Sequence, residues 1–129
     1  MKVHDIPAML RDLPLLTITA NTTAEEAGAA FPQLASFNEG GIFVGRYSGQ
    51  PLWERHPKAD ELLYVLEGEI DITVLTDDGP VHATVGAGSI FVVPQGLWHR
   101  PVAWAAVTLL SATPKPTEVS FAEDPRREG

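Results

Sequence analysis

Hydrophobic and polar residues alternate strictly along residues 69–75, where Ile70, Ile72 and Val74 are separated by polar side chains. Because successive side chains of a strand point to opposite faces, this pattern predicts a strand with one buried and one solvated face. The preceding segment, 61–68, is apolar at five consecutive positions. A run of that kind predicts a strand that is covered on both faces.

Short apolar and β-branched runs recur from residue 40 onward, and glycine or proline separates them. The expected strands are 40–47, 52–56, 61–68, 69–75, 81–85, 89–93, 97–102 and 105–111. Regularly spaced short strands with turn residues between them are typical of a β-sandwich or a β-barrel.

The two ends of the chain follow a different pattern. Residues 1–20 predict an irregular arm with one strand around 15–19, and Thr23 with Glu26 forms a capping box that predicts a helix over 24–30. Segment 117–121 predicts an edge strand, on this chain or on a partner chain. We therefore divide the chain into an N-terminal arm (1–35), a β-barrel (36–113) and a C-terminal tail (114–129).

Composition narrows the classes of function. Acidic residues outnumber basic ones by 17 to 9, which gives a net charge of -8 and opposes binding to nucleic acids and anionic membranes. The absence of cysteine excludes disulfides, thiol catalysis and cysteine-ligated metals. Charged and proline residues interrupt the first twenty positions, so we expect neither a signal peptide nor a membrane span, and a cytoplasmic protein.

Residues that commonly bind metals gather around the strand at 52–56. Glu54 and His56 are two positions apart, so their side chains share one face of a strand. Glu61 follows after four residues and opens the next strand, and Gly68 follows after six more. We expect Glu61 to return to the cavity that Glu54 and His56 face.

A second group follows the strand at 89–93. Gly88 precedes Pro94-Gln95-Gly96 by five residues, and His99 comes two residues later. The turn at Pro94 to Gly96 feeds His99 onto a new strand. The two groups are separated by 19 residues, 69 to 87.

This order of spacings resembles the two sequence motifs of the cupin superfamily over residues 40–111, with the short separation of the small single-domain cupins. Three positions depart from the pattern. Glu54 replaces the first histidine of His-x-His, Gly49 precedes it by four residues instead of five, and Ala103 replaces the closing asparagine of the second motif. The resemblance implies an all-β fold, an antiparallel jelly-roll-like barrel that follows a short helical or irregular arm.

The resemblance also implies one divalent metal ion, Fe, Mn, Zn or Ni, held by Glu54, His56, Glu61 and His99. Glutamate is a competent ligand for such metals. Two interpretations of Glu54 stay open. It is either a metal ligand, or a catalytic base beside a site made of two histidines and one carboxylate.

The function implied by the resemblance is a metal-dependent enzyme that acts on a small organic molecule, of the dioxygenase, isomerase or lyase type. The alternative is a non-enzymatic module that binds or senses a sugar or another small molecule, with or without a metal; His56 and His99 would then be buried, hydrogen-bonded histidines. We expect a homodimer, because segment 61–68 is apolar on both faces and because small cupins commonly pair.

Residues outside the motifs carry weaker expectations. His82 lies beside a turn, and we expect it to face solvent. Arg46 and Arg100 either anchor an anionic ligand or lie at the surface.

Overall fold

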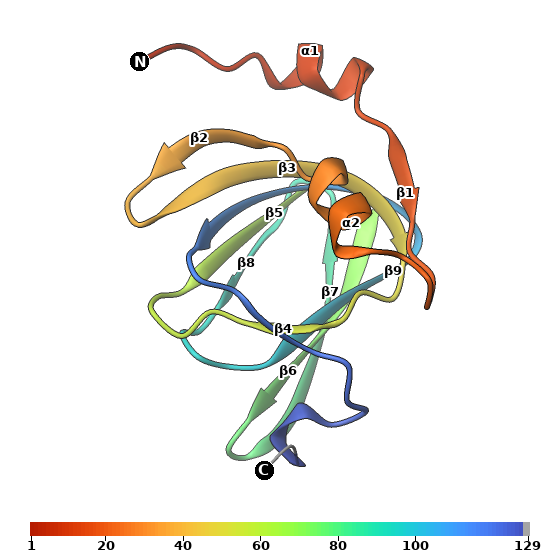
Figure 1. Cartoon of the computed structure of the whole chain (residues 1–129), viewed down its shortest axis with the longest axis vertical. Coiled ribbons are helices and arrows are strands. Elements are labelled where there is room, and N and C mark those ends of the chain that lie inside the picture. Colours follow the sequence, from red (N-terminus) through yellow and green to blue (C-terminus); the bar gives the residue numbers. More distant parts are fainter. Residues whose placement is uncertain (128–129) are drawn as a thin grey trace.

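Ten strands form a barrel in the computed structural model, which describes residues 1–127 (Figure 1), and all their pairings are antiparallel except that of β1 with β3. The strands are β1 (Leu15–Thr17), β2 (Gln33–Phe37), β3 (Gly40–Gly49), β4 (Trp53–Arg55), β5 (Glu61–Glu67), β6 (Glu69–Thr76), β7 (Gly79–Gly86), β8 (Ile90–Val93), β9 (His99–Pro114) and β10 (Glu118–Ser120). Two short helices, α1 (Ile6–Arg11) and α2 (Ala24–Ala30), precede β2, and a 3₁₀ turn at Pro125–Arg127 ends the described chain. The predicted all-β antiparallel barrel with a short helical arm is confirmed.

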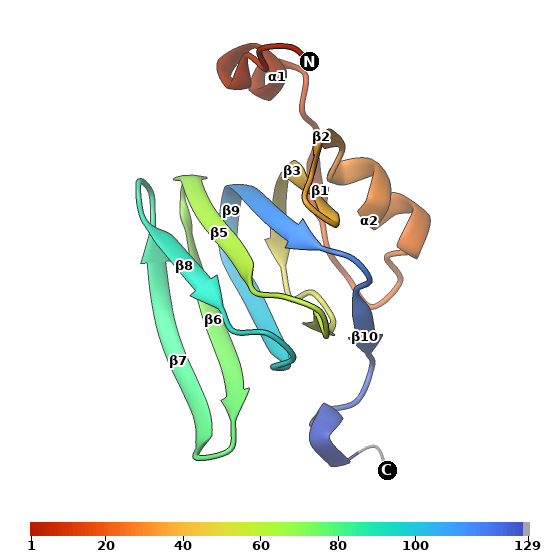
Figure 2. The same ribbon diagram turned by 90° about the vertical axis from the view of Figure 1, so that its left-hand side faces the viewer.

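Strand β9 joins the two halves of the barrel. Its first residues, 99–102, pair with β6, and His99 also pairs with Glu54 of β4. Its later residues pair with β3 on one side and with β5 on the other. Figure 2 shows β5, β8 and β9 side by side, with β6 and β7 forming the other wall.

The sequence predicted two strands, 97–102 and 105–111, where the structure has this one strand. The pairing of β3 with β9 shifts between Gly49↔Ala103 and Tyr47↔Val107. Trp104, Ala105 and Ala106 lie in that irregular stretch and are exposed. The gap between the two predicted strands, at Ala103 and Trp104, therefore lies close to the point where one strand passes from one sheet to the other.

The core lies between the inner faces of the two walls. Alternate residues of β6 are buried as predicted, with Ile70 and Ile72 at most 1% exposed. The remaining members of the cluster come from several strands: Tyr47, Leu63, Val65, Val74, Val85, Val93, Ala103, Val107 and Leu109. Burying this apolar surface provides the main free energy that closes the barrel.

Strand β5 corrects one expectation. Leu63 and Val65 are buried in the core, but Leu62, Tyr64 and Leu66 on its other face are only half-buried in the single chain. Gly68 then allows the tight turn into β6, because its φ of 81° is in the left-handed region and an added Cβ would collide with the carbonyl oxygen of Ala106.

The N-terminal arm is more ordered than the sequence predicted. The capping box of Thr23 and Glu26 starts α2 at the expected residue. Helix α1 was not predicted; Asp5 caps it, with the backbone N–H of Ala8 donating to the Asp5 carboxylate. Strand β2 was also missed, and it forms an antiparallel pair with β3. Strand β1 forms near the predicted position and is parallel to β3.

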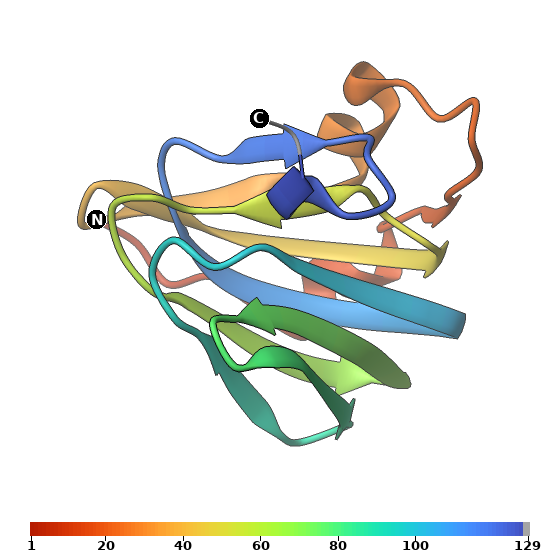
Figure 3. The same cartoon turned by 90° about the horizontal axis from the view of Figure 1, so that it is seen from below.

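The C-terminal tail pairs with its own chain. Strand β10 lies at the predicted position and runs antiparallel to β4, with Val119 opposite Glu54 (Figure 3). The division of the chain into arm, barrel and tail stays a prediction. Within residues 1–127, no helix has the length and apolar character needed to cross a bilayer. The cytoplasmic location also stays a prediction.

Arg46 connects the arm to the barrel. Its guanidinium donates to the backbone carbonyls of Leu10 and Leu13 at 3.3 and 3.0 Å. It also donates to the Thr108 hydroxyl at 3.0 Å and forms an ion pair with Glu67 at 3.1 Å. Arg46 therefore holds the end of α1 against the barrel wall.

We predict that Arg46→Met frees the arm. Loss of the donors should lower the free energy of unfolding by about 1–3 kcal/mol, because partly buried acceptors lose their partner. Hydrogen–deuterium exchange should accelerate over residues 6–13 and stay unchanged in β6. Arg11→Met, at an exposed position of the same helix, serves as the control; equal exchange in both variants would contradict this role of Arg46.

Candidate metal centre

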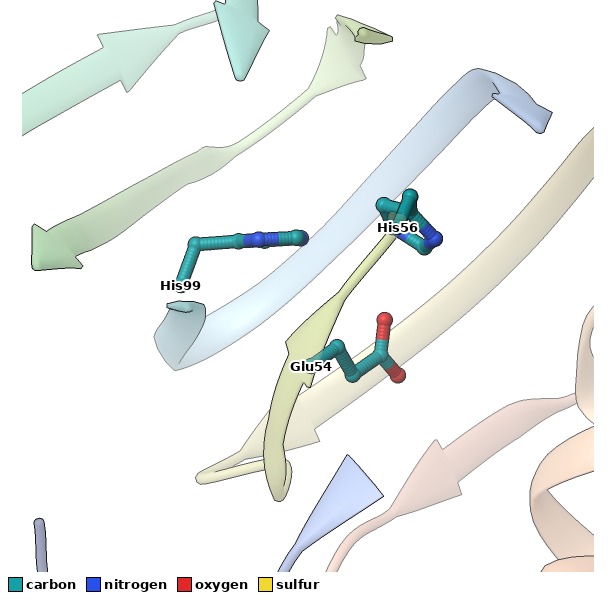
Figure 4. Close-up of side chains that lie close together, drawn as sticks. All are labelled: Glu54, His56 and His99. Atoms are coloured by element: carbon teal, nitrogen blue, oxygen red, sulfur yellow. The ribbon is translucent and has the colours of Figure 1, made fainter. Parts of the chain in front are cut away.

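Strand β4 and its partner bring the first three polar side chains together. Glu54 and His56 project to the same side of the chain, while Trp53 and Arg55 face the other way. In the pairing of β4 with β9, Glu54 lies directly opposite His99. Figure 4 shows the three side chains pointing toward one another. Their potential ligand atoms all lie within 4.8 Å of one another.

Glu61, the first residue of β5, completes the group from the opposite wall. Its Oε1 lies 3.2 Å from Nε2 of His56 and 3.1 Å from Nε2 of His99. Its Oε2 accepts a hydrogen bond from the Thr113 hydroxyl at 2.6 Å. The structure thus brings all four residues singled out from the sequence to one place, although they come from three separate segments.

The ring orientation of His99 is fixed by the backbone. Its Nδ1 lies 3.0 Å from the carbonyl oxygen of Leu97. A carbonyl only accepts, so Nδ1 carries a proton and donates it. In the neutral ring, Nε2 then presents its lone pair to the centre of the group, as a metal ligand must.

The ring of His56, like that of His99, turns Nε2 toward Glu61 and has a polar contact at Nδ1. Its Nδ1 lies 3.0 Å from the Thr117 hydroxyl, and its Nε2 faces Glu61. The separation from Glu61 is short, but the direction does not suit a hydrogen bond, and within residues 1–127 this Nε2 is the buried side-chain polar atom that lacks a partner. An unsatisfied buried nitrogen is costly unless a cation or another group occupies the position it faces.

The pKa values of the two carboxyl groups, Glu54 and Glu61, are shifted in opposite directions. Burial alone would raise the pKa of Glu61, but the close contacts with the imidazoles of His56 and His99 and their positive charge outweigh it and lower that pKa to about 2. Burial raises the pKa of Glu54, and the charge of Glu61 raises it further, against the opposing effect of the histidines. Burial would lower the pKa of His99, but the contacts with Glu61 raise it overall.

Glu61 is therefore held as an anion. Glu54 is half-buried, and among the hydrogen bonds of residues 1–127 its carboxylate has no donor. A carboxyl that is shifted toward the protonated form and free of fixed partners is suited to exchanging protons.

The residues fit one divalent ion. Bonds of about 2.0–2.2 Å from metal to nitrogen or oxygen place neighbouring ligand atoms about 3 Å apart. The separations from Glu61 to both imidazoles match this spacing. Imidazole and carboxylate are also the donor types that Fe, Mn, Zn and Ni accept. His56, Glu61 and His99 are correspondingly almost fully buried, whereas Glu54 keeps contact with the surface.

Three further residues around the site were not predicted from the sequence. The Tyr47 hydroxyl donates to the carbonyl of Pro101 at 2.7 Å, and burial, together with the charges of Glu54 and Glu61, raises the pKa of Tyr47. Tyr47 is thus an uncharged wall beside the site. Thr113 and Thr117 were not singled out either, although strand alternation from the buried Ser111 could have placed Thr113 inward.

The remaining candidates lie elsewhere. His82 is exposed, as predicted, and its Nδ1 contacts the Thr73 hydroxyl. Arg46 is occupied by the arm, and Arg100 lies 4.3 Å over the ring of Trp53. The structure brings neither arginine into the group around Glu61.

The chain is similar in sequence to curated germin-like proteins. Germin-like protein subfamily 2 member 4 of Arabidopsis thaliana is 36% identical over 77 residues, which cover 56% of this chain and 35% of that protein. The chain thus spans about a third of the length of this curated relative.

Two solved structures share the fold. A conserved protein of unknown function from Streptococcus pyogenes, SPY1581, has a TM-score of 0.61 at 21% identity and covers 89% of this chain and 88% of its own. Hydroquinone 1,2-dioxygenase PnpCD, solved with Cd²⁺ and 4-hydroxybenzonitrile, has a TM-score of 0.56 at 19% identity. The match covers 65% of this chain and 63% of the dioxygenase chain. At these identities the likeness concerns the fold alone.

The family comparison covers the part of the chain that builds the barrel. The model of the cupin domain matches residues 44–110, a span that includes Glu54, His56, Glu61 and His99 and more than half of the chain. The protein therefore belongs to the cupin family.

Proposed function

We propose that this protein binds one divalent metal ion through His56, Glu61 and His99 and acts as an enzyme on a small organic molecule that carries oxygen ligands. The observation that carries the proposal is the approach of both Nε2 atoms to one oxygen of Glu61, with Nε2 of His56 buried and unpaired. Fe, Mn, Zn and Ni are the candidate ions, since this donor set accepts each of them.

When bound, such an ion would act as a Lewis acid and orient the oxygen atoms of a substrate. Glu54 would hold or move a proton at its carboxylate, because that carboxylate lies within 4.8 Å of nitrogens of His56 and His99 and has a raised pKa. Tyr47 would line the site without exchanging protons, since its hydroxyl is bonded to Pro101. The dioxygenase, isomerase and lyase types of reaction all suit this arrangement.

The solved structure of hydroquinone 1,2-dioxygenase, which shares the fold, suggests which small molecules to test first. That protein was solved with a divalent cation and a phenolic nitrile. Hydroquinones, catechols and small hydroxy acids are therefore the first probes, because their oxygen atoms can bind to a metal.

We predict about one equivalent of divalent metal per chain after loading with Fe(II), Mn(II), Ni(II) or Zn(II). His99→Ala should weaken binding by at least about tenfold, since it removes a nitrogen donor. His82→Ala, at the exposed histidine, should bind as the wild type does. Elemental analysis measures the number of metal ions per chain, and competition with a chelating dye measures the affinity. A wild type that binds none of the four ions would instead support a non-enzymatic ligand-binding module.

We predict that Glu54→Gln separates metal binding from turnover. If Glu54 is the base, the variant should keep its metal and lose about 10²–10⁴-fold in turnover of a substrate found with these probes. Oxygen uptake or product analysis measures turnover, and metal analysis of the same sample measures occupancy. Loss of the metal in Glu54→Gln would show that Glu54 is a ligand.

We also propose that two copies pair through the outer face of β5, β8 and β9. This face consists of Leu62, Tyr64, Ile90, Val92, Leu110 and Ala112, which the strand pairing places side by side. Ile90 is 62% exposed and Val92 48% exposed. None of the six is charged in a chain of net charge -8, so two copies of this face can approach without repulsion.

We predict that Val92→Lys yields a monomer where the wild type is a dimer, because the change places a charge in the proposed contact. Val81→Lys is the matched control, since Val81 lies on β7 and is also 48% exposed. Light scattering after size-exclusion chromatography measures the mass. A monomeric wild type, or equal effects of both variants, would contradict the proposed contact.

A further inference from the structure

We infer that Thr117, in the C-terminal tail, is a positioning residue for the metal ligand His56. This inference rests on the proposed function, because it concerns how His56 would present Nε2 to the ion. Thr117 lies beyond residue 110, where the match to the cupin domain ends. The tail would therefore complete a site whose ligands all come from the barrel.

The tail is fixed beside the strand that carries the site. Strand β10 pairs with β4, which aligns Glu118 with Arg55 and Val119 with Glu54. The Arg55 guanidinium and the Glu118 carboxylate lie 2.9 Å apart, with their side chains 37% and 44% exposed. These contacts lie immediately after Thr117 and set its distance from His56.

A second anchor lies further along the tail. The Trp53 indole N–H donates to the carbonyl of Glu123 at 3.2 Å, and Pro125 is buried. Trp53 is on β4, one residue before Glu54, and the Arg100 guanidinium covers its ring. The tail is thus attached to β4 through β10 and again beyond it, at Glu123, and Thr117 directly precedes the paired residue Glu118.

The contact with His56 has a direction once Nε2 is the ligand atom. A neutral imidazole that binds a metal through Nε2 carries its proton on Nδ1. Nδ1 of His56 must then donate to the Thr117 hydroxyl oxygen, 3.0 Å away. Without that acceptor, the ring would favour the tautomer with a proton on Nε2, which points at Glu61.

The two histidines therefore differ in one respect. His99 donates from Nδ1 to a backbone carbonyl, that of Leu97, which no substitution of a side chain removes. His56 depends on a side chain that is itself exposed. Because Thr117 contributes little to the core, its substitution can change the orientation of His56 without unfolding the barrel.

The test compares Thr117→Val, which has nearly the same shape and no hydroxyl, with Thr117→Ser, which keeps the hydroxyl. Zinc affinity is measured by competition with a chelating dye, and the tautomer of His56 by ¹⁵N NMR of the metal-free protein. Thr117→Val should bind zinc about 10–100-fold more weakly, as loss of a hydrogen-bond partner of a ligating histidine does. Thr117→Ser should bind near the wild-type level.

The thermal unfolding midpoint in the presence of a chelator separates positioning from a structural role. The inference expects both variants to unfold near the wild-type temperature, with His56 shifted toward the Nε2–H tautomer only in Thr117→Val. Unchanged zinc affinity and tautomer in Thr117→Val would overturn the inference and leave the proposed metal site intact. A wild type that binds no metal would overturn the proposed function instead, and the NMR result would still decide whether Thr117 sets the tautomer.

Discussion

The contact that governs this structure is the one between a buried carboxylate, Glu61, and the two imidazoles of His56 and His99. Removing a carboxylate from water is costly unless positive charge or hydrogen-bond donors replace the solvent. Thr113 supplies a donor to one oxygen, and the imidazoles face the other. Neutral rings protonated on Nδ1 would turn lone pairs toward that oxygen. A cation between them, a metal ion or added protons, resolves the conflict.

The register of the paired strands holds these three polar side chains close together. His99 lies between Glu54 on β4 and the core residue Val74 on β6, and its side chain is buried. Glu61 is fixed at the start of β5 by pairing with Val93. A shift of one residue in any of these pairings would turn a ligand to the outer face. The same packing that closes the core therefore assembles the site, and the cost of the buried polar groups is offset by apolar burial around them.

Much of the barrel could be predicted from the sequence because local patterns decide it. The alternation over Ile70 to Val74, the capping box at Thr23 and the turn glycine at Gly68 each depend on neighbouring residues. Ala103 and Trp104 were predicted to separate two strands because the pairing, and not the sequence, continues β9 across them. Strand β2 was missed for a similar reason, since its half-exposed residues are ordered by β3.

The candidate site, too, could be predicted only in part from the sequence. Spacing identified the four residues around Glu61, because positions two apart share a strand face and the turns return the chain to one cavity. Spacing could not predict that Glu61 would contact both imidazoles while Glu54 kept no fixed partner, since those distances follow from the register of β4, β5 and β9. Nor could it predict the contact of Thr117 with His56, which joins residues 61 positions apart.

The C-terminal tail also holds β4 in place, through the pairing of β10 with β4. In this short strand Trp53 is buried, whereas Glu54 and Arg55 are half-buried, and a strand with an unpaired edge frays readily. Strand β9 pairs with β4 through one residue, His99, which lies opposite Glu54. Strand β10, in contrast, pairs with all three residues of β4. The strand that bears Glu54 and leads into His56 is thus held largely by the tail. Without the tail, all three residues of β4 would lose the partner strand β10, and within the rest of the described chain the strand that bears Glu54 would keep only the pair of Glu54 with His99.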